Sequence, residues 1–409
     1  MYTLVFYLII SIIILDFILD RWLAYLNAKN RNAQLPVELQ GIYDEEKYKK
    51  SVAYDTVNGK FELLTSSLNF VIILFLLFGA GFAFVDQLAG EVTSNPIYKA
   101  LVFFLILGLA SDIIHLPFSI YDTFVIEEKF GFNKTTPKVF VLDKLKGWLL
   151  SLVLGGGIGF VVLWFYYKTT DLFWIYAWAL TSVVMIFFAM FYSNIIVPLF
   201  NKQEPLEDGE LKDAIAQFAN KVGFKLDNIY RIDGSKRSSK ANAYFTGLGA
   251  KKRIVLYDTL INDLTTNEIV AVLAHEIGHY KRKHTIQGIV LSVLQTGITF
   301  YLLSLFLSIP ELSFALGVSK PSFHIGIISF GILYSPISML LGLGLHMLSR
   351  KNEYEADAFT KANFEAEHLI SALKKLSINN LSNLTPHPTY VFFHYSHPTL
   401  LERIRALNK

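Results

Sequence analysis

The residues best placed to do chemistry are His275, Glu276 and His279, which form the motif His-Glu-Ile-Gly-His. On a helix, residues four positions apart lie on one face, so both imidazoles can bind the same metal ion. Zn²⁺ is the expected ion, because the chain has no cysteine to supply a thiolate and zinc accepts imidazole and carboxylate ligands. Glu276 lies beside the ligands, where it can act as general base toward water. The motif therefore predicts zinc-dependent peptide hydrolysis.

A third ligand is expected from the segment Ser349–Asp357. Glu353 and Asp357 are one helical turn apart, so we expect Glu353 to bind the metal. Asp357 would then accept the second ring N–H of a ligand histidine. Arg350, one turn before Glu353, is expected to neutralise this acidic cluster. Spacing alone also allows Glu355 to be the third ligand. It further allows these acidic residues to form a solvated helix face that binds no metal.

The elements that position the motif can also be read from the sequence. Residues 251–259 have the composition of a short strand, and the edge of this strand at residues 253–257 is expected to pair with an extended peptide. Thr265 and Glu268 then resemble a capping box at the start of the metal-binding helix. A strand followed by a capped helix is the predicted local structure.

Composition places this chemistry in a membrane protein. Of the 409 residues, 53% are hydrophobic and 17% are charged, and a net charge of +3 without a basic cluster argues against nucleic-acid binding. A helix needs roughly 20 apolar residues to cross a bilayer. Seven segments meet this length, at residues 2–22, 63–85, 99–121, 147–167, 172–198, 285–309 and 323–347.

Basic residues in the connections predict the orientation, because Lys and Arg in short loops stay in the cytoplasm. Residues at span ends are counted with the adjoining connection. From the first connection to the carboxyl tail, the Lys and Arg counts are seven, one, five, one, fourteen, one and eight. The odd connections and the tail are therefore predicted to be cytoplasmic, and the amino terminus outside or lumenal. Both a bacterial inner membrane and an endoplasmic reticulum membrane fit, and the compact loops favour the bacterial membrane.

This topology divides the chain into four parts. Spans one to five with their loops occupy residues 1–200, and a cytoplasmic metalloprotease segment occupies 201–284. Spans six and seven occupy 285–347, and 348–409 form a carboxyl-terminal cytoplasmic segment that completes the metal site. Charged groups within spans usually face water or a bundle interior, so Asp112 and His115 are candidates for lining an internal chamber, with a position at the membrane surface as the alternative.

Beyond the metal motif, four stretches resemble the type I CAAX prenyl endopeptidases, integral-membrane zinc proteases that include the enzyme that processes prelamin A. They are Ile126–Thr136, Ser235–Phe245, Glu353–Asp357 and Tyr395–Thr399, and the resemblance extends over nearly the whole chain. The first of them separates this family from the shorter HtpX heat-shock proteases, which share the metal motif.

The resemblance implies several properties. The fold would be mainly α, with seven transmembrane helices around a water-filled chamber, capped on the cytoplasmic side by a small α+β gluzincin-like zinc protease domain. Glu353 would be the third ligand in preference to Glu355. Asn242 and His397 would bind the substrate backbone or stabilise the tetrahedral intermediate. The substrate would be a peptide or protein cut near the carboxyl terminus of a prenylated CAAX protein.

Two other functions remain open from the sequence. A quality-control protease of the HtpX type would use the same chemistry on unprenylated membrane proteins. A seven-span channel, transporter or metal-binding receptor without hydrolytic activity is the alternative from another class, although binding alone does not require a base such as Glu276 beside the metal.

Overall fold

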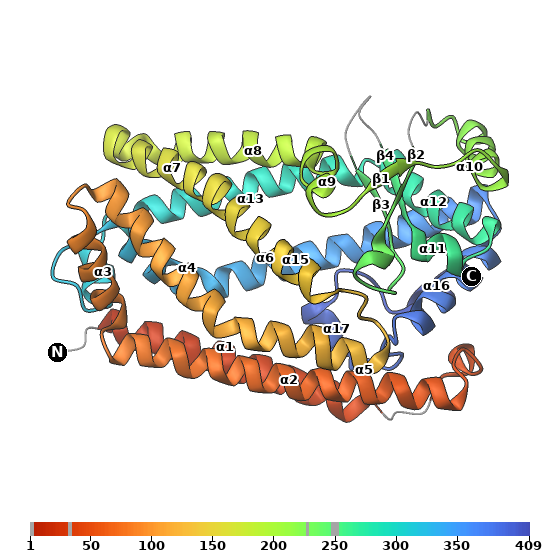
Figure 1. The fold of residues 1–409 in the computed structure, drawn as a ribbon, viewed down its shortest axis with the longest axis horizontal. Helices are drawn as coiled ribbons and strands as arrows, with labels where there is room; N and C mark the ends of the chain where they lie inside the picture. Colours follow the sequence, from red (N-terminus) through yellow and green to blue (C-terminus); the bar gives the residue numbers. More distant parts are fainter. Residues whose placement is uncertain (1–3, 32–34, 226–228, 247–252) are drawn as a thin grey trace.

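The computed structural model describes residues 4–31, 35–225, 229–246 and 253–409. Long apolar helices run side by side along most of its length, and the strands lie at one end, opposite the amino terminus (Figure 1). The long helices are α1 (Leu4–Asn30), α2 (Glu45–Phe78), α4 (Pro96–Tyr121), α6 (Pro137–Leu150), α7 (Gly156–Thr169), α8 (Phe173–Ile195), α13 (His284–Leu307) and α15 (Phe323–Asn363). Shorter connecting helices are α3 (Gly81–Val92), α5 (Glu128–Phe130), α9 (Val197–Phe200) and α14 (Pro310–Phe314).

Five helical runs in the described residues are long and apolar enough to cross a membrane: Glu45–Phe78, Pro96–Phe130, Pro137–Leu199, His284–Leu307 and Phe323–Asn363. The third run contains two of the predicted spans, because α7 and α8 are separated only by Thr170–Leu172 and then lie side by side (Figure 1). Helix α1 is not among the five. The chain is therefore a mainly helical, polytopic membrane protein, and the count of seven spans stays a prediction.

The helices extend beyond most of the predicted spans, and two of them depart from the prediction in shape. Helix α2 ends at Phe78, because Ala80 takes a left-handed conformation with φ 51°, so the segment 63–85 contains a break before α3. Helix α15 continues unbroken past Pro336 and past residue 347 as far as Asn363. Residues 2–3 of the first predicted span lie outside the described residues.

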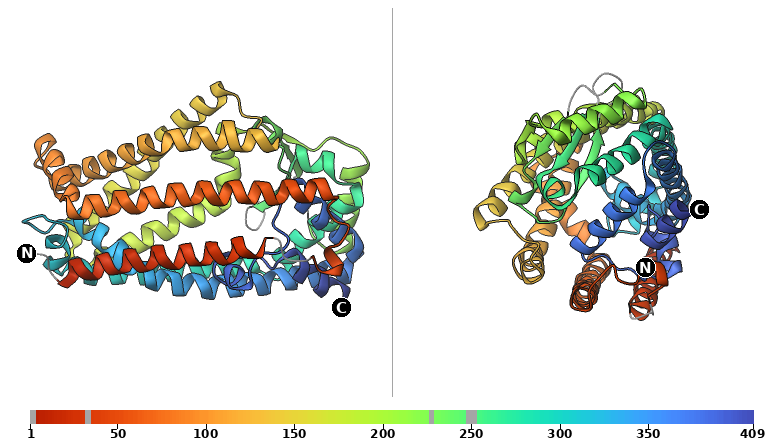
Figure 2. Two further views of the ribbon diagram at one scale, coloured as in Figure 1. Left: turned by 90° about the horizontal axis from the view of Figure 1, so that it is seen from below. Right: turned by 90° about the vertical axis from the view of Figure 1, so that its right-hand side faces the viewer.

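A four-stranded sheet lies at the end of the molecule away from the amino terminus (Figure 2). Its strands are β1 (Gln203–Pro205), β2 (Ile229–Ile232), β3 (Ala243–Thr246) and β4 (Arg253–Tyr257), in the order β1-β2-β4-β3. The pair β2–β4 is parallel and the other two pairs are antiparallel.

The position of β4 corrects one expectation from the sequence. The predicted strand exists, although residues 251–252 lie outside the described part of the chain. Because β4 pairs with β2 on one side and with β3 on the other, it has no free edge for a peptide. The edge strand next to β4 is β3, which residue composition alone did not predict.

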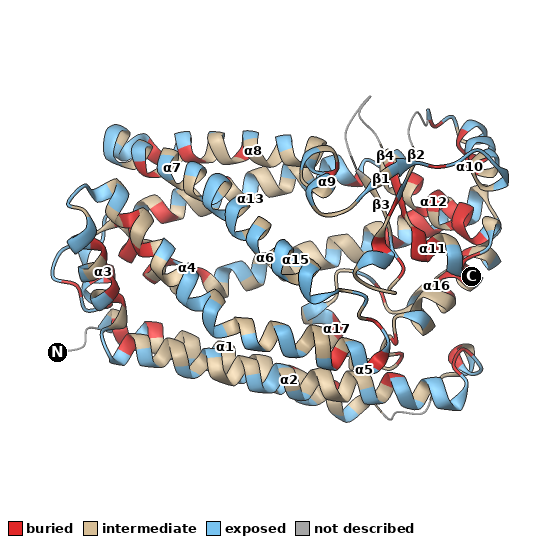
Figure 3. Ribbon diagram, in the orientation of Figure 1, coloured by how far each residue is buried: buried red, intermediate tan, exposed pale blue. Residues whose placement is uncertain are grey.

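Helices from two distant parts of the chain lie at the same end of the molecule as the sheet (Figure 1), and some of them contact one another rather than the strands. They are α10 (Glu210–Lys221), α11 (Asp258–Asp263), α12 (Thr266–Lys281), α16 (Ala366–Asn379), α17 (Pro388–His394) and α18 (Leu400–Asn408). Buried residues concentrate around α11 and α12 (Figure 3), and one apolar core contains Ile254 and Ile277 together with Ala372, which follows α15. The polar stretches on either side of α13 and α15 therefore share a core.

Candidate metal centre and active site

The metal-binding helix α12 begins at the predicted capping box. The Thr265 hydroxyl accepts from the Glu268 backbone N–H, and the Glu268 carboxylate accepts from the Thr265 backbone N–H. The same buried carboxylate also accepts from Ser371 at 2.6 Å and from Lys375 at 2.8 Å, both on α16. Burial alone would raise its pKa, but hydrogen bonds from Lys375 and Ser371 lower the pKa of Glu268 to about 2. An ionised carboxylate thus fixes the start of α12 against α16.

Three potential ligand atoms meet between α12 and α15. His275 Nε2 lies 3.1 Å from His279 Nε2 and 3.3 Å from Glu353 Oε2, and His279 Nε2 lies 3.2 Å from Glu353 Oε1. A tetrahedral Zn²⁺ with bonds of about 2.0–2.1 Å places its ligand atoms roughly 3.3 Å apart. The donor set and its spacing therefore fit one zinc ion, and the structure brings together the three residues expected as ligands.

Close contact between α12 and α15 makes this geometry possible. A Cβ atom on Gly278 would lie 3.1 Å from Ala356 Cα, closer than most real contacts. Because the contact is with backbone rather than with a flexible side chain, any larger residue would push the helices apart. Gly278 thereby controls the separation between the two histidines on α12 and the carboxylate on α15.

A buried ionic network supports His275. Its Nδ1 lies 2.9 Å from Asp357 Oδ1, the contact expected from the sequence, and Asp357 accepts two bonds from Arg403 on α18, at 2.6 and 2.9 Å. Burial would lower the pKa of His275, but hydrogen bonds to Asp357 and Glu353 raise the pKa to about 9. Arg403 also approaches Glu353, with 3.6 Å between Nη1 and Oε2.

Arg350 does not neutralise the acidic cluster, contrary to expectation. Its guanidinium donates to the Tyr395 carbonyl at 2.5 Å and lies over the Phe392 ring. The cation at the cluster is Arg403, which was not expected from the sequence. The sequence signal for Arg403 was its position on α18, one turn before the buried Leu407 and therefore on the same face.

A different chain of contacts supports His279. Its Nδ1 lies 3.0 Å from His284 Nδ1, and His284 Nε2 lies 3.2 Å from Glu355 Oε2. If His284 donates through Nε2 to Glu355, its Nδ1 can accept the His279 Nδ1 proton, which leaves His279 Nε2 free to bind a metal. Glu355, the alternative ligand, thus contacts His284 and supports His279 indirectly. His284 was not expected at the site.

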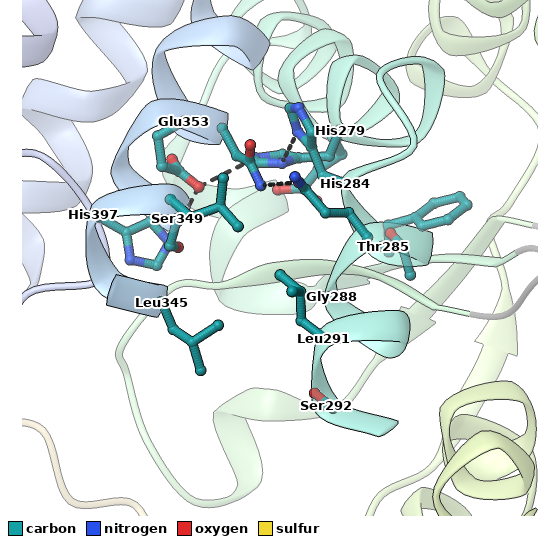
Figure 4. Close-up of a pocket in the computed structure, with 15 residues that line it drawn as sticks. His279, His284, Thr285, Gly288, Leu291, Ser292, Leu345, Ser349, Glu353 and His397 are labelled. Carbon is teal, nitrogen blue, oxygen red and sulfur yellow. Dashed lines mark hydrogen bonds and ion pairs between the residues drawn. The ribbon is translucent and has the colours of Figure 1, made fainter. Parts of the chain in front are cut away.

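A cavity of about 490 Å³ adjoins two of the three ligands, His279 and Glu353. His279, Glu353 and His397 lie at one end, and the cavity continues past residues of α13 and α15, among them Leu291 and Leu345 (Figure 4). Glu276 also lines this cavity. His397 is 63% exposed, and its Nε2 lies 3.4 Å from Glu353 Oε1. The structure therefore gathers the expected base, two expected ligands and the expected histidine donor around one space.

The other expected site residues lie elsewhere. Asn242 is exposed at the start of β3, where its Oδ1 accepts from the Ala243 N–H, and it is not among the residues that line the cavity. Asp112 on α4 accepts from Lys144 at 2.8 Å and from Trp148 at 2.9 Å. His115 contacts Asn69 on α2 at 2.7 Å. These contacts join neighbouring long helices.

Comparisons with known proteins agree with this arrangement. Residues 24–202 match the family described as CAAX prenyl protease N-terminal, five membrane helices, and residues 205–409 match peptidase family M48. The chain is 38% identical to CAAX prenyl protease 1 of Saccharomyces cerevisiae, over 97% of this chain and 93% of that protein. This chain belongs to the CAAX prenyl protease 1 family of M48 peptidases. It is therefore an integral-membrane metalloprotease.

Further relatives support the assignment. The human CAAX prenyl protease 1 homolog is 34% identical and aligns over 94% of this chain and 92% of its own length. The crystal structure of S. mikatae Ste24p superimposes with a TM-score of 0.94 at 35% identity, covering all of both chains. The whole fold of this protease is thus shared with a solved structure of the family.

Proposed function

We propose that this metalloprotease is a zinc endopeptidase that cuts prenylated CAAX proteins near their carboxyl terminus. The observation that carries the proposal is the convergence of His275, His279 and Glu353 with the base Glu276 at one end of a cavity. The names of its relatives supply the substrate class.

Each residue at the site has a proposed role. His275, His279 and Glu353 hold the ion, which when bound supplies a Lewis acid that polarises the scissile carbonyl and lowers the pKa of water to about 7. Glu276 accepts the proton of the attacking water and returns it to the leaving amine. His397 donates a hydrogen bond to the oxyanion from the exposed side of the cavity, a contribution of roughly 3 kcal/mol. Asn242 orients the substrate backbone beside β3.

The membrane arrangement is proposed from the positive residues and the helices together. Seven spans place the protease segment and the carboxyl terminus in the cytoplasm and the amino terminus outside or in the lumen. An internal water-filled chamber between the spans is part of this proposal. Asp112 and His115 are proposed to line this chamber.

The absence of cysteine allows a direct test of the orientation. Lys320 and Lys361 are both exposed, and the proposed topology places them on opposite sides of the membrane. In sealed vesicles with the non-cytoplasmic face outward, a membrane-impermeant maleimide should label Lys320→Cys but label Lys361→Cys only after permeabilisation. Labelling of both variants in sealed vesicles would contradict the proposed orientation.

Glu276→Gln tests the mechanism. We expect proteolysis to fall by roughly 10³-fold, because the general base is lost, while zinc content stays at one ion per chain. Glu367→Gln, an exposed position on α16 outside the cavity, is the matched control and should retain activity. Normal cleavage by Glu276→Gln would reject the proposed role of Glu276.

The substrate class is tested with purified wild-type protein. It should cleave a farnesylated CAAX peptide faster than the same peptide without the lipid, and both should outpace an unprenylated misfolded membrane protein. Cleavage of the misfolded protein alone would reject the CAAX assignment in favour of quality control.

A further inference from the structure

A second cavity lies on the other side of His397 from the metal site. Its volume is about 560 Å³, and His397 lines both cavities. Its walls come from α2, from the connection after α16, and from the connection between α17 and α18. No role at the metal site accounts for this space.

The walls carry unused hydrogen-bonding capacity. Within the part of the chain that the structure describes, Asn380 Oδ1 and Asn383 Nδ2 are buried without a hydrogen-bond partner, and both residues line this cavity. The orientation of the Asn383 amide is set by its Oδ1, which accepts from the Thr385 N–H at 2.9 Å. A free acceptor and a free donor thus occur on two residues three positions apart.

The charges of the lining residues limit the chemical groups that this cavity can bind. Asp55 is the one Asp, Glu, Lys or Arg among the lining residues, all of them described, and it pairs with Arg31. Without an unpaired Lys or Arg in the wall, the cavity does not offer the charge-assisted bonds that a carboxylate or phosphate prefers. A neutral group that both donates and accepts is complementary to the two amides, and a peptide backbone is such a group.

The two cavities lead in different directions from the site. The metal-site cavity continues along α13 and α15 past Leu291 and Leu345, into helices long and apolar enough to span the membrane (Figure 4). The second cavity is lined instead by residues 54–58 of α2, which precede the predicted span at 63–85, and by connections outside those runs, at residues 380–386 and 394–400. A substrate held at the membrane by its lipidated end would therefore extend its remaining chain into the second cavity.

We propose that this second cavity is an extended substrate subsite that binds the peptide backbone on the amino-terminal side of the scissile bond. The proposal rests on the proposed CAAX substrate. In that substrate only a short segment follows the scissile bond, so an extended subsite can serve only the chain that precedes the bond. Both amide atoms are covered in the structure, so on substrate binding the side chains turn Asn380 Oδ1 toward a backbone N–H and Asn383 Nδ2 toward a backbone carbonyl. The substrate polypeptide passes His397 between the two cavities.

Two farnesylated peptides with the same CAAX end test the subsite. One carries about two residues before the modified cysteine, and the other about fifteen, which extend roughly 50 Å. Asn383→Asp keeps the Oδ1 acceptor for Thr385 but removes the Nδ2 donor. Asn58→Trp fills the cavity from α2, and Ala53→Trp, exposed on the same helix outside the cavity, is the matched control.

Both cavity variants should raise the KM for the long peptide about tenfold, as the loss of a buried hydrogen bond or of the binding space predicts. The kinetic constants for the short peptide should stay within about twofold of wild type, and Ala53→Trp should affect neither peptide. Equal losses for both peptides, or no loss for the long one, would overturn the proposal.

A binding experiment separates this proposal from the proposed activity. In Glu276→Gln, which binds without cleaving, a photoreactive residue about five positions before the scissile bond reaches roughly 17 Å and should label the segment 377–386. Labelling of α13 or α15 alone would overturn the subsite even if the wild-type protease cleaves CAAX peptides. Labelling at 377–386 would support it even if cleavage were found to prefer another substrate.

Discussion

The two histidines of the metal site have the same expected role but different surroundings. His275 is buried and contacts Asp357, which is held by Arg403. His279 is 21% exposed and contacts His284, which leads to Glu355, itself 38% exposed. One histidine is supported by buried charges from α15 and α18, and the other by a neutral ring and a carboxylate that water can reach.

The different surroundings of His275 and His279 imply different effects on folding stability and on metal binding. A buried carboxylate and its cation link His275 to the packing of α18, so a change there affects both folding and metal binding. The chain through His284 sets the orientation of His279 without placing an uncompensated charge in the core. We therefore expect stability effects on the His275 side and smaller effects, confined to the metal, on the His279 side.

Arg403→Ala should have the largest effect. It leaves the buried carboxylates of Asp357 and Glu353 without their cation, a change that typically costs about 3–5 kcal/mol. Thermal unfolding of the purified protein should shift strongly downward, and metal content should fall. Arg405→Ala, on an exposed face of the same helix, should leave the unfolding midpoint almost unchanged. Similar losses in both variants would contradict the comparison.

Removal of the metal should expose a pH dependence that originates at His275. Its pKa is raised from 6.5 to about 9 in the folded chain, so the stabilisation is fully present below pH 6.5 and is lost as the pH rises through 9. The difference corresponds to about 3 kcal/mol. The unfolding midpoint of chelator-treated protein should fall between pH 6.5 and 9, and zinc should suppress that fall. A midpoint that rises over this range would be inconsistent with the assignment.

Asp357→Asn tests the charge of the His275 support without changing its size. Loss of a carboxylate that orients a metal-binding histidine typically lowers metal affinity by about 10–100-fold. Competition with a fluorescent zinc chelator measures the change. Asp263→Asn, on α11 away from the metal site, should leave the affinity unchanged.

Glu355→Gln should have the smallest effect. Because this carboxylate is partly exposed, water can replace its contact with His284, so zinc affinity should fall less than tenfold and the unfolding midpoint should hardly move. The same zinc competition and a thermal scan measure both quantities. A loss as large as that of Asp357→Asn would show that the two supports are equivalent.

Local patterns on one helix were predictable from the sequence. The capping box at Thr265 and Glu268 and the pairing of His275 with His279 depend on fixed helical spacing, and the structure contains both contacts. The membrane class followed from composition. Helical spacing placed Glu353 and Asp357 on one face. The preference for Glu353 over Glu355 needed the family resemblance, because the sequence of one helix does not show how that helix packs against another.

Contacts that depend on chain reversals could not be predicted. On a continuous helix, His284 would lie about 140° around the axis from His279, but Lys283 adopts φ 62° and turns the chain so that the two rings meet. Arg403 reaches Asp357 only because α18 packs against α15. The strand order that gives β3 the outer position likewise depends on pairing between distant residues.

Helix α15 has a mechanical consequence. It contains 41 residues and runs from the apolar bundle to Asn363, so Glu353 lies about 25 Å along the same rod from Pro336. A tilt of about 5° around that proline would move the Glu353 carboxylate by about 2 Å, the length of one bond to zinc. Mismatch between helix length and membrane thickness is one cause of helix tilt, together with packing against neighbouring helices. A change of thickness that tilted α15 would therefore act on the distance between a carboxylate and two imidazoles.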